Sequence, residues 1–119
     1  MYTSNRVVHV MGEMWVVKFL TEEEDPRLSD RLGLCDTSCR EIVIAKELSG
    51  DSKNLTSIHK KIVRHEVIHA FLFECGLDHG SHSPVAWGVD EEITDWFALN
   101  GEKIYSVWKE LGVTDDRQW

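Results

Sequence analysis

The stretch His65-Glu66-Val67-Ile68-His69 lies within a long segment with a helical pattern of apolar residues. Ser52 or Asn54 can cap the start of this helix, and Gly76 stands where a left-handed stop is expected. The sequence therefore predicts one helix from Asn54 to Glu74. Apolar residues recur along it at close to helical period, at Ile58, Ile62, Val63, Ala70 and Phe73.

The two His of this stretch are four residues apart, so their imidazoles lie one above the other on the same helix face. That separation lets His65 and His69 reach one tetrahedral zinc ion, with Zn–N distances of about 2.0–2.1 Å. Glu66 can reach a metal-bound water without binding the metal. The H-E-x-x-H pattern is typical of zinc metalloproteases, in which the Glu is the general base. The plainer interpretation is a buried helix that carries two His, but such a helix gains nothing from burying a Glu between them.

A second helix is predicted from Val89 to Leu111, with an alternative break at Asn100-Gly101. Glu91 and Asp95 share one of its faces because they are four residues apart. A carboxylate at Glu91 would complete a His-His-Glu zinc site and leave the fourth position open for water. Asp95 could accept the free N–H of a ligand imidazole and fix its tautomer. Glu92 is the competing third ligand; otherwise it is a solvated helix charge.

Residues 91–95, Glu-Glu-Ile-Thr-Asp, resemble the E-x-x-x-D element of the gluzincins, the thermolysin-type zinc peptidases. In that family the Glu is the third ligand and the Asp pairs with the first His, which implies that Asp95 pairs with His65. The string Glu-Glu-x-x-Asp-x-Phe-Ala is also similar to the small ImmA/IrrE-like metallopeptidases and, more loosely, to SprT-like ones. Many of these are encoded by phages and mobile elements. The resemblance covers residues 41 to 105.

The resemblance implies a zinc-dependent metallopeptidase, an endopeptidase rather than an exopeptidase, acting on a protein or peptide substrate. Its Zn²⁺ cofactor would be held by His65, His69 and Glu91, and Glu66 would activate the zinc-bound water. A second hypothesis is a zinc-binding regulatory or scaffold domain with a zincin fold and little or no proteolytic activity. A third is a structural domain without metal. The zinc content of the purified protein separates the third hypothesis from the first two.

A donor for the oxyanion is not evident from the sequence. Thermolysin-like enzymes use a Tyr and a His beyond the ligands, and the candidates here are His79, His82 and Tyr105. The plainer interpretations are exposed loop positions for the two His and core packing for Tyr105. His9 and His59 are interpreted as structural or exposed, since His59 faces away from the metal ligands on the predicted helix.

The 119 residues predict a single zincin-like domain over residues 1–119. The net charge of −8 argues against nucleic-acid binding, which requires a basic patch. Three Cys without a secretory pattern predict a reducing, cytoplasmic location, with free thiols favoured over a half metal site at Cys35-x-x-x-Cys39. The segment from Met1 to Leu20 is broken by charged residues, so neither a signal peptide nor a membrane span is predicted. The oligomeric state is left open.

The expected fold class is α+β, because strand patterns come first and helices second. Val7–Met11 and Trp15–Leu20 predict a hairpin with its turn at Gly12-Glu13, and Leu28–Leu32 is compatible with a helical turn before Gly33. We expect a minimal zincin-like domain, with a small, mostly antiparallel sheet of about three strands packed on the active-site helix and a long C-terminal helix. The resemblance places the predicted strand Glu41–Lys46 at the edge of the substrate cleft, where an extended peptide would pair with it.

Overall fold

The computed structural model describes residues 4–48, 55–77 and 91–114; of residues 91, 92, 94, 95 and 98 it describes only the backbone. These ranges form a four-stranded sheet and two long helices, so the predicted α+β class is confirmed with one strand more than expected. In chain order the elements are β1 (Arg6–Val10), β2 (Glu13–Leu20), the 3-10 helix η1 (Pro26–Ser29), β3 (Gly33–Asp36), β4 (Glu41–Ala45), α1 (Leu55–Glu74) and α2 (Glu91–Leu111).

The predicted N-terminal hairpin is present as β1 and β2. Val10 pairs with Glu13, so the turn is the two residues between them, Met11 and Gly12. Both have positive φ, 53° and 84°, as a two-residue type I′ hairpin turn requires. This turn matches the right-handed twist of the strands and fixes their register.

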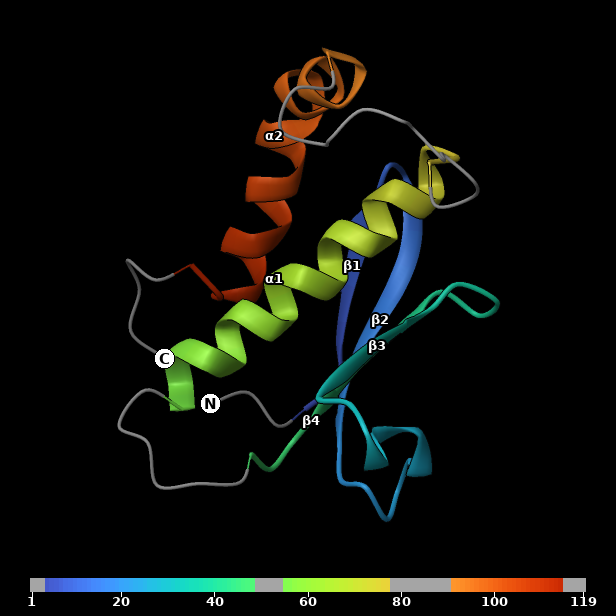
Figure 1. The fold of residues 1–119 in the computed structure, drawn as a ribbon, viewed down its shortest axis with the longest axis vertical. Helices are drawn as coiled ribbons and strands as arrows, with labels where there is room; N and C mark the ends of the chain where they lie inside the picture. Colours follow the sequence, from blue (N-terminus) through green and yellow to red (C-terminus); the bar gives the residue numbers. More distant parts are fainter. Residues whose placement is uncertain (1–3, 49–54, 78–90, 115–119) are drawn as a thin grey trace.

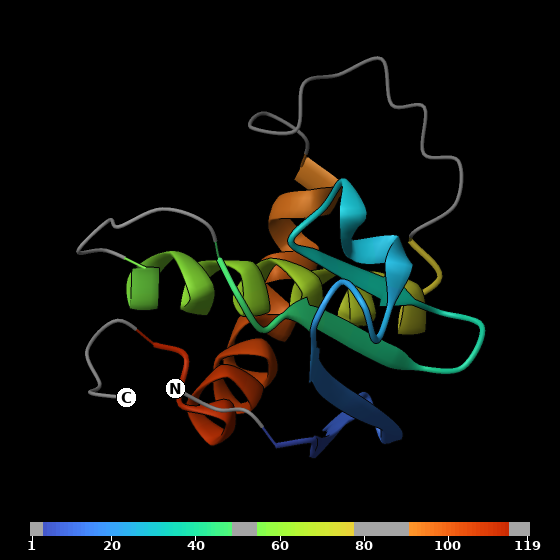
Figure 2. The ribbon, with the colours of Figure 1, turned by 90° about the horizontal axis from the view of Figure 1, so that it is seen from below.

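The order of the strands across the sheet is β1-β2-β4-β3, with β2 and β4 parallel and the other two pairs antiparallel. The prediction that the strand before the active-site helix forms an edge is therefore wrong: β4 lies between two strands, and β3 is the edge. Ile42 to Ala45 are all buried, because both faces of β4 are covered. An unbroken apolar run of this kind is typical of an interior strand. Figure 2 shows β1 and β3 at opposite margins of the sheet.

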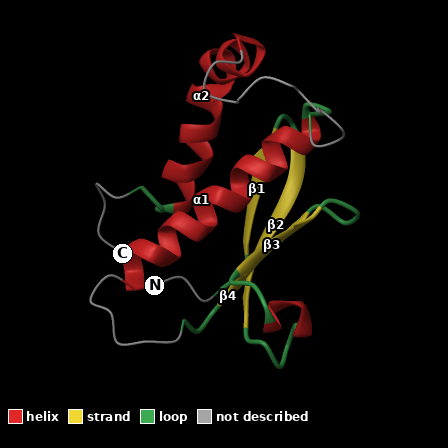
Figure 3. Cartoon of the chain, in the orientation of Figure 1, coloured by secondary structure: helices red, strands yellow, loops and turns green. Residues whose placement is uncertain are grey.

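Both long helices cover the same face of the sheet (Figures 1 and 3). α1 crosses β3, β4 and β1, and α2 packs against α1 and β1. The main core fills this interface, with Trp15, Ile42 and Phe71 among its largest buried side chains. A smaller apolar cluster of Leu28, Leu34, Val43 and Ala45 lies on the opposite face of the sheet. Among the described helices, none is long and apolar enough to cross a membrane.

Each long helix ends at a glycine with positive φ, Gly76 at 72° and Gly112 at 71°. At Gly76 the following amide, that of Leu77, donates to the Leu72 carbonyl at 2.8 Å, which closes a Schellman motif. The predicted end of α1 is thus confirmed, while its predicted caps, Ser52 and Asn54, lie outside the described residues. The Glu74 carboxylate, 7% exposed in the last turn, fixes this end to the sheet by accepting from Trp15 Nε1 at 2.7 Å and Arg40 Nε at 2.7 Å.

Helix α2 runs unbroken through Asn100 and Gly101, so the alternative of a break there is not found. Figure 1 shows the first turns of α2 at an angle to the rest. Asn100 Nδ2 donates to the Trp96 carbonyl at 3.0 Å, a bond of a side chain to the preceding turn that often accompanies a bend. Among the side chains that the structure describes, a Cβ on Gly101 would meet Phe97 of the same helix, at the ordinary contact distance of 3.6 Å. Gly101 is therefore not required for the approach of a neighbouring element.

Candidate functional site

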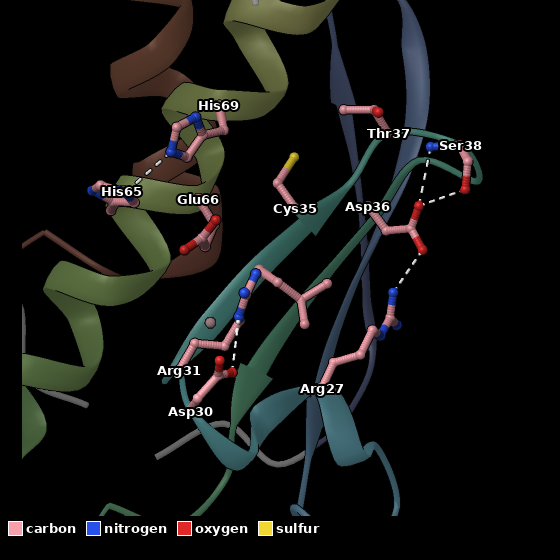
Figure 4. A pocket seen from close by; sticks show the side chains of 12 residues that line it. Arg27, Asp30, Arg31, Cys35, Asp36, Thr37, Ser38, His65, Glu66 and His69 are labelled. Carbon is pink, nitrogen blue, oxygen red and sulfur yellow. Dashed lines mark hydrogen bonds and ion pairs between the residues drawn. The ribbon is translucent and has the colours of Figure 1, made fainter.

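The two His of the H-E-x-x-H stretch lie on an exposed face of α1, as their spacing predicts. Their Nε2 atoms point toward each other across 3.1 Å, and the ring centroids are 4.8 Å apart (Figure 4). With both rings neutral, one Nε2–H donates to the other nitrogen. The helix thus brings the Nε2 atoms of His65 and His69 to one point on its surface.

The separation of the two nitrogens fits a shared zinc ion. Two ligand nitrogens at about 2.0–2.1 Å from a tetrahedral zinc are roughly 3.3 Å apart. The 3.1 Å between the Nε2 atoms of His65 and His69 is close to this value, so both side chains could act as ligands with little change of rotamer. The donor set is also suitable, because neutral imidazole is a common zinc ligand.

Glu66 lies beside the two His but is buried, with 7% of its surface exposed. Burial raises the pKa of its carboxyl above the ordinary value, while the nearby His65, His69 and Arg31 act in the opposite direction. A carboxyl with a raised pKa holds a proton more readily, which suits a group that accepts and then releases one.

Gly33, the first residue of β3, allows α1 to carry Glu66 close to the sheet. A Cβ at this position would lie 2.8 Å from Ile62 Cγ2, closer than real contacts allow, and 3.2 Å from Glu66 Oε2, which is tighter than most. In the sequence Gly33 was considered only as the residue after a helical turn. A glycine that opens a strand also signals close backbone approach, and this signal could have found it.

A cavity of about 880 Å³ lies between α1 and the edge strand β3. This is within the usual size of ligand pockets. His65, Glu66 and His69 form its helix wall, and β3 with the residues around it forms the other (Figure 4). The residues on that second wall are Arg27, Asp30, Arg31, Gly33, Leu34, Cys35, Asp36, Thr37 and Ser38.

Arg27 fixes η1 to the end of β3 within this second wall. Its guanidinium bonds Asp25 through Nη2 at 2.8 Å and Asp36 through Nη1 at 2.8 Å. Asp36 also accepts from the Ser38 hydroxyl at 2.5 Å. The hydrogen bond from Ser38 has the largest effect on the pKa of Asp36, and the bond from Arg27 has the next largest. Together they hold this pKa well below its usual range. The ion pair between Arg27 and Asp36 therefore holds this wall of the pocket in place.

The other residues predicted for the metal site are described in part or not at all. Glu91 is the first residue of α2, and its side chain, like those of Glu92 and Asp95, is outside the described part of the chain. His79 and His82 lie outside the described residues altogether. Among the described side chains, no group of three His, Cys, Asp or Glu is placed to hold a metal. The third ligand and its hydrogen-bond partner stay predictions.

Tyr105 lies on α2 with 46% of its surface exposed, so it is not a core residue, and it is not among the residues that line the pocket. His9 is exposed on β1. His59 is fully buried, and its Nε2–H donates to the Ala45 carbonyl at 2.9 Å, which confirms its structural interpretation. The role of Tyr105 as an oxyanion donor stays a prediction.

All three Cys are free thiols, as predicted. Cys35 lines the pocket, whereas Cys39 is exposed in the turn after β3. Cys39 Sγ donates to the Glu41 carboxylate at 3.1 Å, and this bond, more than burial, raises the pKa of the thiol to about 11. Comparisons with protein-family models, curated proteins and solved structures find no match for the chain.

Proposed function

We propose that the chain is a zinc-dependent metallopeptidase that hydrolyses peptide bonds in the pocket between α1 and β3. The observation that carries the proposal is the convergence of His65 Nε2 and His69 Nε2 to 3.1 Å, next to a buried Glu66 that lines the same pocket. The resemblance of residues 91–95 to the gluzincin element supports Glu91 as the third ligand. The free thiols support a reducing compartment such as the cytoplasm.

Each residue of the site has a defined task in this reaction. His65, His69 and Glu91 would hold the zinc ion, which when bound supplies Lewis acidity to the scissile carbonyl and lowers the pKa of water. Glu66 would accept a proton from the attacking water at a carboxylate oxygen. It would then deliver that proton to the amine nitrogen as the C–N bond breaks, while the water oxygen stays on the new carboxyl group.

The substrate would lie along β3 rather than along β4. Within the described residues β3 pairs only with β4, so its outer edge has backbone donors and acceptors for an extended peptide. The same strand lines the pocket opposite His65 and Glu66. Pairing with backbone groups accepts many sequences, and a peptide can continue past both ends of a strand edge. This arrangement is suited to an endopeptidase.

The decisive test compares the wild type with Glu66→Gln, a variant that keeps the shape of the side chain. We expect one zinc per chain in both proteins, measured by elemental analysis. Cleavage of fluorescently labelled casein should fall in the variant by a factor of about 10²–10⁴, the usual contribution of a general base. Full cleavage by Glu66→Gln would show that the hydrolytic mechanism is wrong.

The same measurements separate the competing hypotheses. Zinc without cleavage in the wild type would favour the regulatory or scaffold domain, and a purified chain without zinc would favour the structural domain. The third ligand is tested by zinc titration of Glu91→Ala, with Glu92→Ala as the matched control on the neighbouring position. Weaker zinc binding in Glu92→Ala alone would show that Glu91 is misassigned.

A further inference from the structure

Two arginines line the pocket, and they differ in how their guanidinium groups are used. Arg27 bonds Asp25 and Asp36, each at 2.8 Å. Arg31 donates only from Nε, to Asp30 at 3.3 Å, and its side chain is 56% exposed. Its Nη groups have no hydrogen-bond acceptor within the described part of the chain. Arg31 therefore has donors available to a bound molecule.

Arg31 is also well placed to meet a substrate. It lies in the connection between η1 and β3, two residues before Gly33. Figure 4 shows its guanidinium pointing into the pocket, on the side of Glu66. Arg31 and Glu66 line the same pocket, so a molecule bound beside Glu66 lies within the space that the Arg31 guanidinium also faces.

The chemistry of a guanidinium restricts what it would bind. Its planar fork of N–H donors matches a carboxylate, with which it forms two parallel bonds, better than it matches a neutral group. A cation with unused donors also makes an anionic group acceptable in the pocket of a chain whose net charge is −8. The Arg27 guanidinium cannot serve in this way, because it is already bonded to two carboxylates.

We propose that Arg31 is a specificity-determining residue that binds a carboxylate of the peptide substrate close to the scissile bond. The carboxylate belongs to an Asp or Glu side chain or to the C-terminus of the peptide. This inference rests on the proposed peptidase function and names the substrate class of the same site. A side-chain carboxylate makes the enzyme an endopeptidase selective for acidic peptides, and a terminal carboxylate makes it a carboxypeptidase.

The test measures peptide binding to the metal-free full-length chain by fluorescence anisotropy. The probes are labelled peptides of one length, built from alanine and leucine, with glutamate or glutamine at one central position and with a free or an amidated C-terminus. We expect one of the two carboxylates to strengthen binding about fivefold, the effect of a partly exposed charged pair. The position of the effective carboxylate identifies its source.

Three variants assign the preference to Arg31. Arg31→Gln should bind all the peptides alike, and Arg31→Lys should keep part of the preference, because it keeps the charge and loses the fork. Lys61→Gln is matched in charge and lies on an exposed position of α1 outside the pocket, so it should behave as the wild type. Equal binding of all peptides by the wild type, or a preference that survives in Arg31→Gln, would overturn the proposal.

Failure of the inference and failure of the proposed function give different results. Binding to the metal-free chain requires neither zinc nor cleavage, so a carboxylate preference can be measured even if the wild type cleaves nothing. Cleavage of casein without any carboxylate preference would remove the role of Arg31 and leave the peptidase intact. Because the Arg31 side chain is exposed, Arg31→Gln should leave the midpoint of thermal unfolding unchanged, which checks that the variant is folded.

Discussion

Helix α1 carries histidines in two opposite surroundings. His59, near its start, is fully buried, packs edge-on against Phe19 at 5.6 Å between ring centroids, and donates to the Ala45 carbonyl. His65 and His69 are exposed, and their Nε2 atoms face each other at the pocket. The difference teaches that the role of a histidine on one helix follows from the face it occupies and the atom its nitrogen meets.

The buried histidine contributes to the stability of the fold, whereas the exposed pair is the one proposed to bind a metal ion. The buried imidazole of His59 is bonded to a backbone carbonyl and joins α1 to the end of β4. Substitution of this residue should therefore destabilise the whole fold. Two exposed imidazoles that bond only each other among the described residues contribute little to stability. The predictions below separate these two contributions.

The largest expected effect is on zinc binding at the exposed pair. His69→Ala should lower the affinity for zinc by more than about 100-fold, because loss of a ligand costs more than loss of the groups behind it. Zinc titration by calorimetry would measure this. The metal-free stability should change by less than about 0.5 kcal/mol, since the side chain is exposed. Unchanged zinc affinity would show that the two imidazoles do not share a metal ion.

The next effect is on stability at the buried histidine. His59→Ala should reduce the free energy of unfolding by about 3 kcal/mol, because it leaves a cavity and an unpaired Ala45 carbonyl. Urea unfolding would measure the change. His9→Ala, on an exposed position of β1, is the control and should have almost no effect. Equal stabilities of the two variants would contradict the assigned role of His59.

A smaller effect is expected where α1 meets the pocket wall. Gly33→Ala should destabilise the fold by about 1–3 kcal/mol, because its Cβ would press on Ile62 and Glu66. Casein cleavage should fall further than stability alone explains, since displacing a catalytic group by about 1 Å can cost about 100-fold in rate.

The matched control for that substitution is Gly101→Ala. Its Cβ would find ordinary contacts in the middle of α2, so it should stabilise the chain by about 0.5–1 kcal/mol. If Gly33→Ala lowers the free energy of unfolding and Gly101→Ala raises it, the close approach of α1 to β3 depends on Gly33. Stabilisation by both would refute the contact.

The smallest effect is a dependence of stability on pH. Burial lowers the pKa of His59 below its ordinary value, against its bond to Ala45. As the pH falls below about 6.5, the unfolded chain takes up a proton at this residue and the folded chain does not, so stability falls. The loss is at most about 1.4 kcal/mol per pH unit.

His59→Gln, which keeps a donor and cannot titrate in this range, should lose less stability on acidification than the wild type. Urea unfolding at neutral and mildly acidic pH would show whether the two proteins differ in slope. The two proteins differ at this residue alone, so a difference in slope is assigned to His59. Parallel slopes would mean that His59 is not held neutral by the fold.

Local patterns predicted α1 closely, because helical spacing and a C-terminal glycine are short-range signals. The helix was expected from Asn54 to Glu74 and is found from Leu55 to Glu74. The hairpin was also found, but its turn is Met11-Gly12 and not the predicted Gly12-Glu13, because Glu13 already pairs with Val10. The two His and the Glu of the pocket needed nothing beyond the geometry of one helix.

The order of the strands in the sheet could not be predicted from local sequence patterns, because it depends on pairing between distant segments. β4 was identified as a strand but assigned to the edge, although its unbroken apolar run Ile42–Ala45 indicates two covered faces. β3 has only four residues, Gly33 to Asp36, and forms a strand only by pairing with β4. The presence of Arg31 in the pocket could not be predicted, because it depends on the place of β3 at the edge of the sheet.

The position of β4 also has a consequence for how the chain folds. The hairpins β1–β2 and β3–β4 each close over a short turn, whereas the β2–β4 seam joins Val16 to Glu41 and must close a long loop against chain entropy. Such non-local pairing slows folding. The two hairpins can therefore form before they pair with each other, and the pocket needs only the β3–β4 hairpin and the docking of α1 against it.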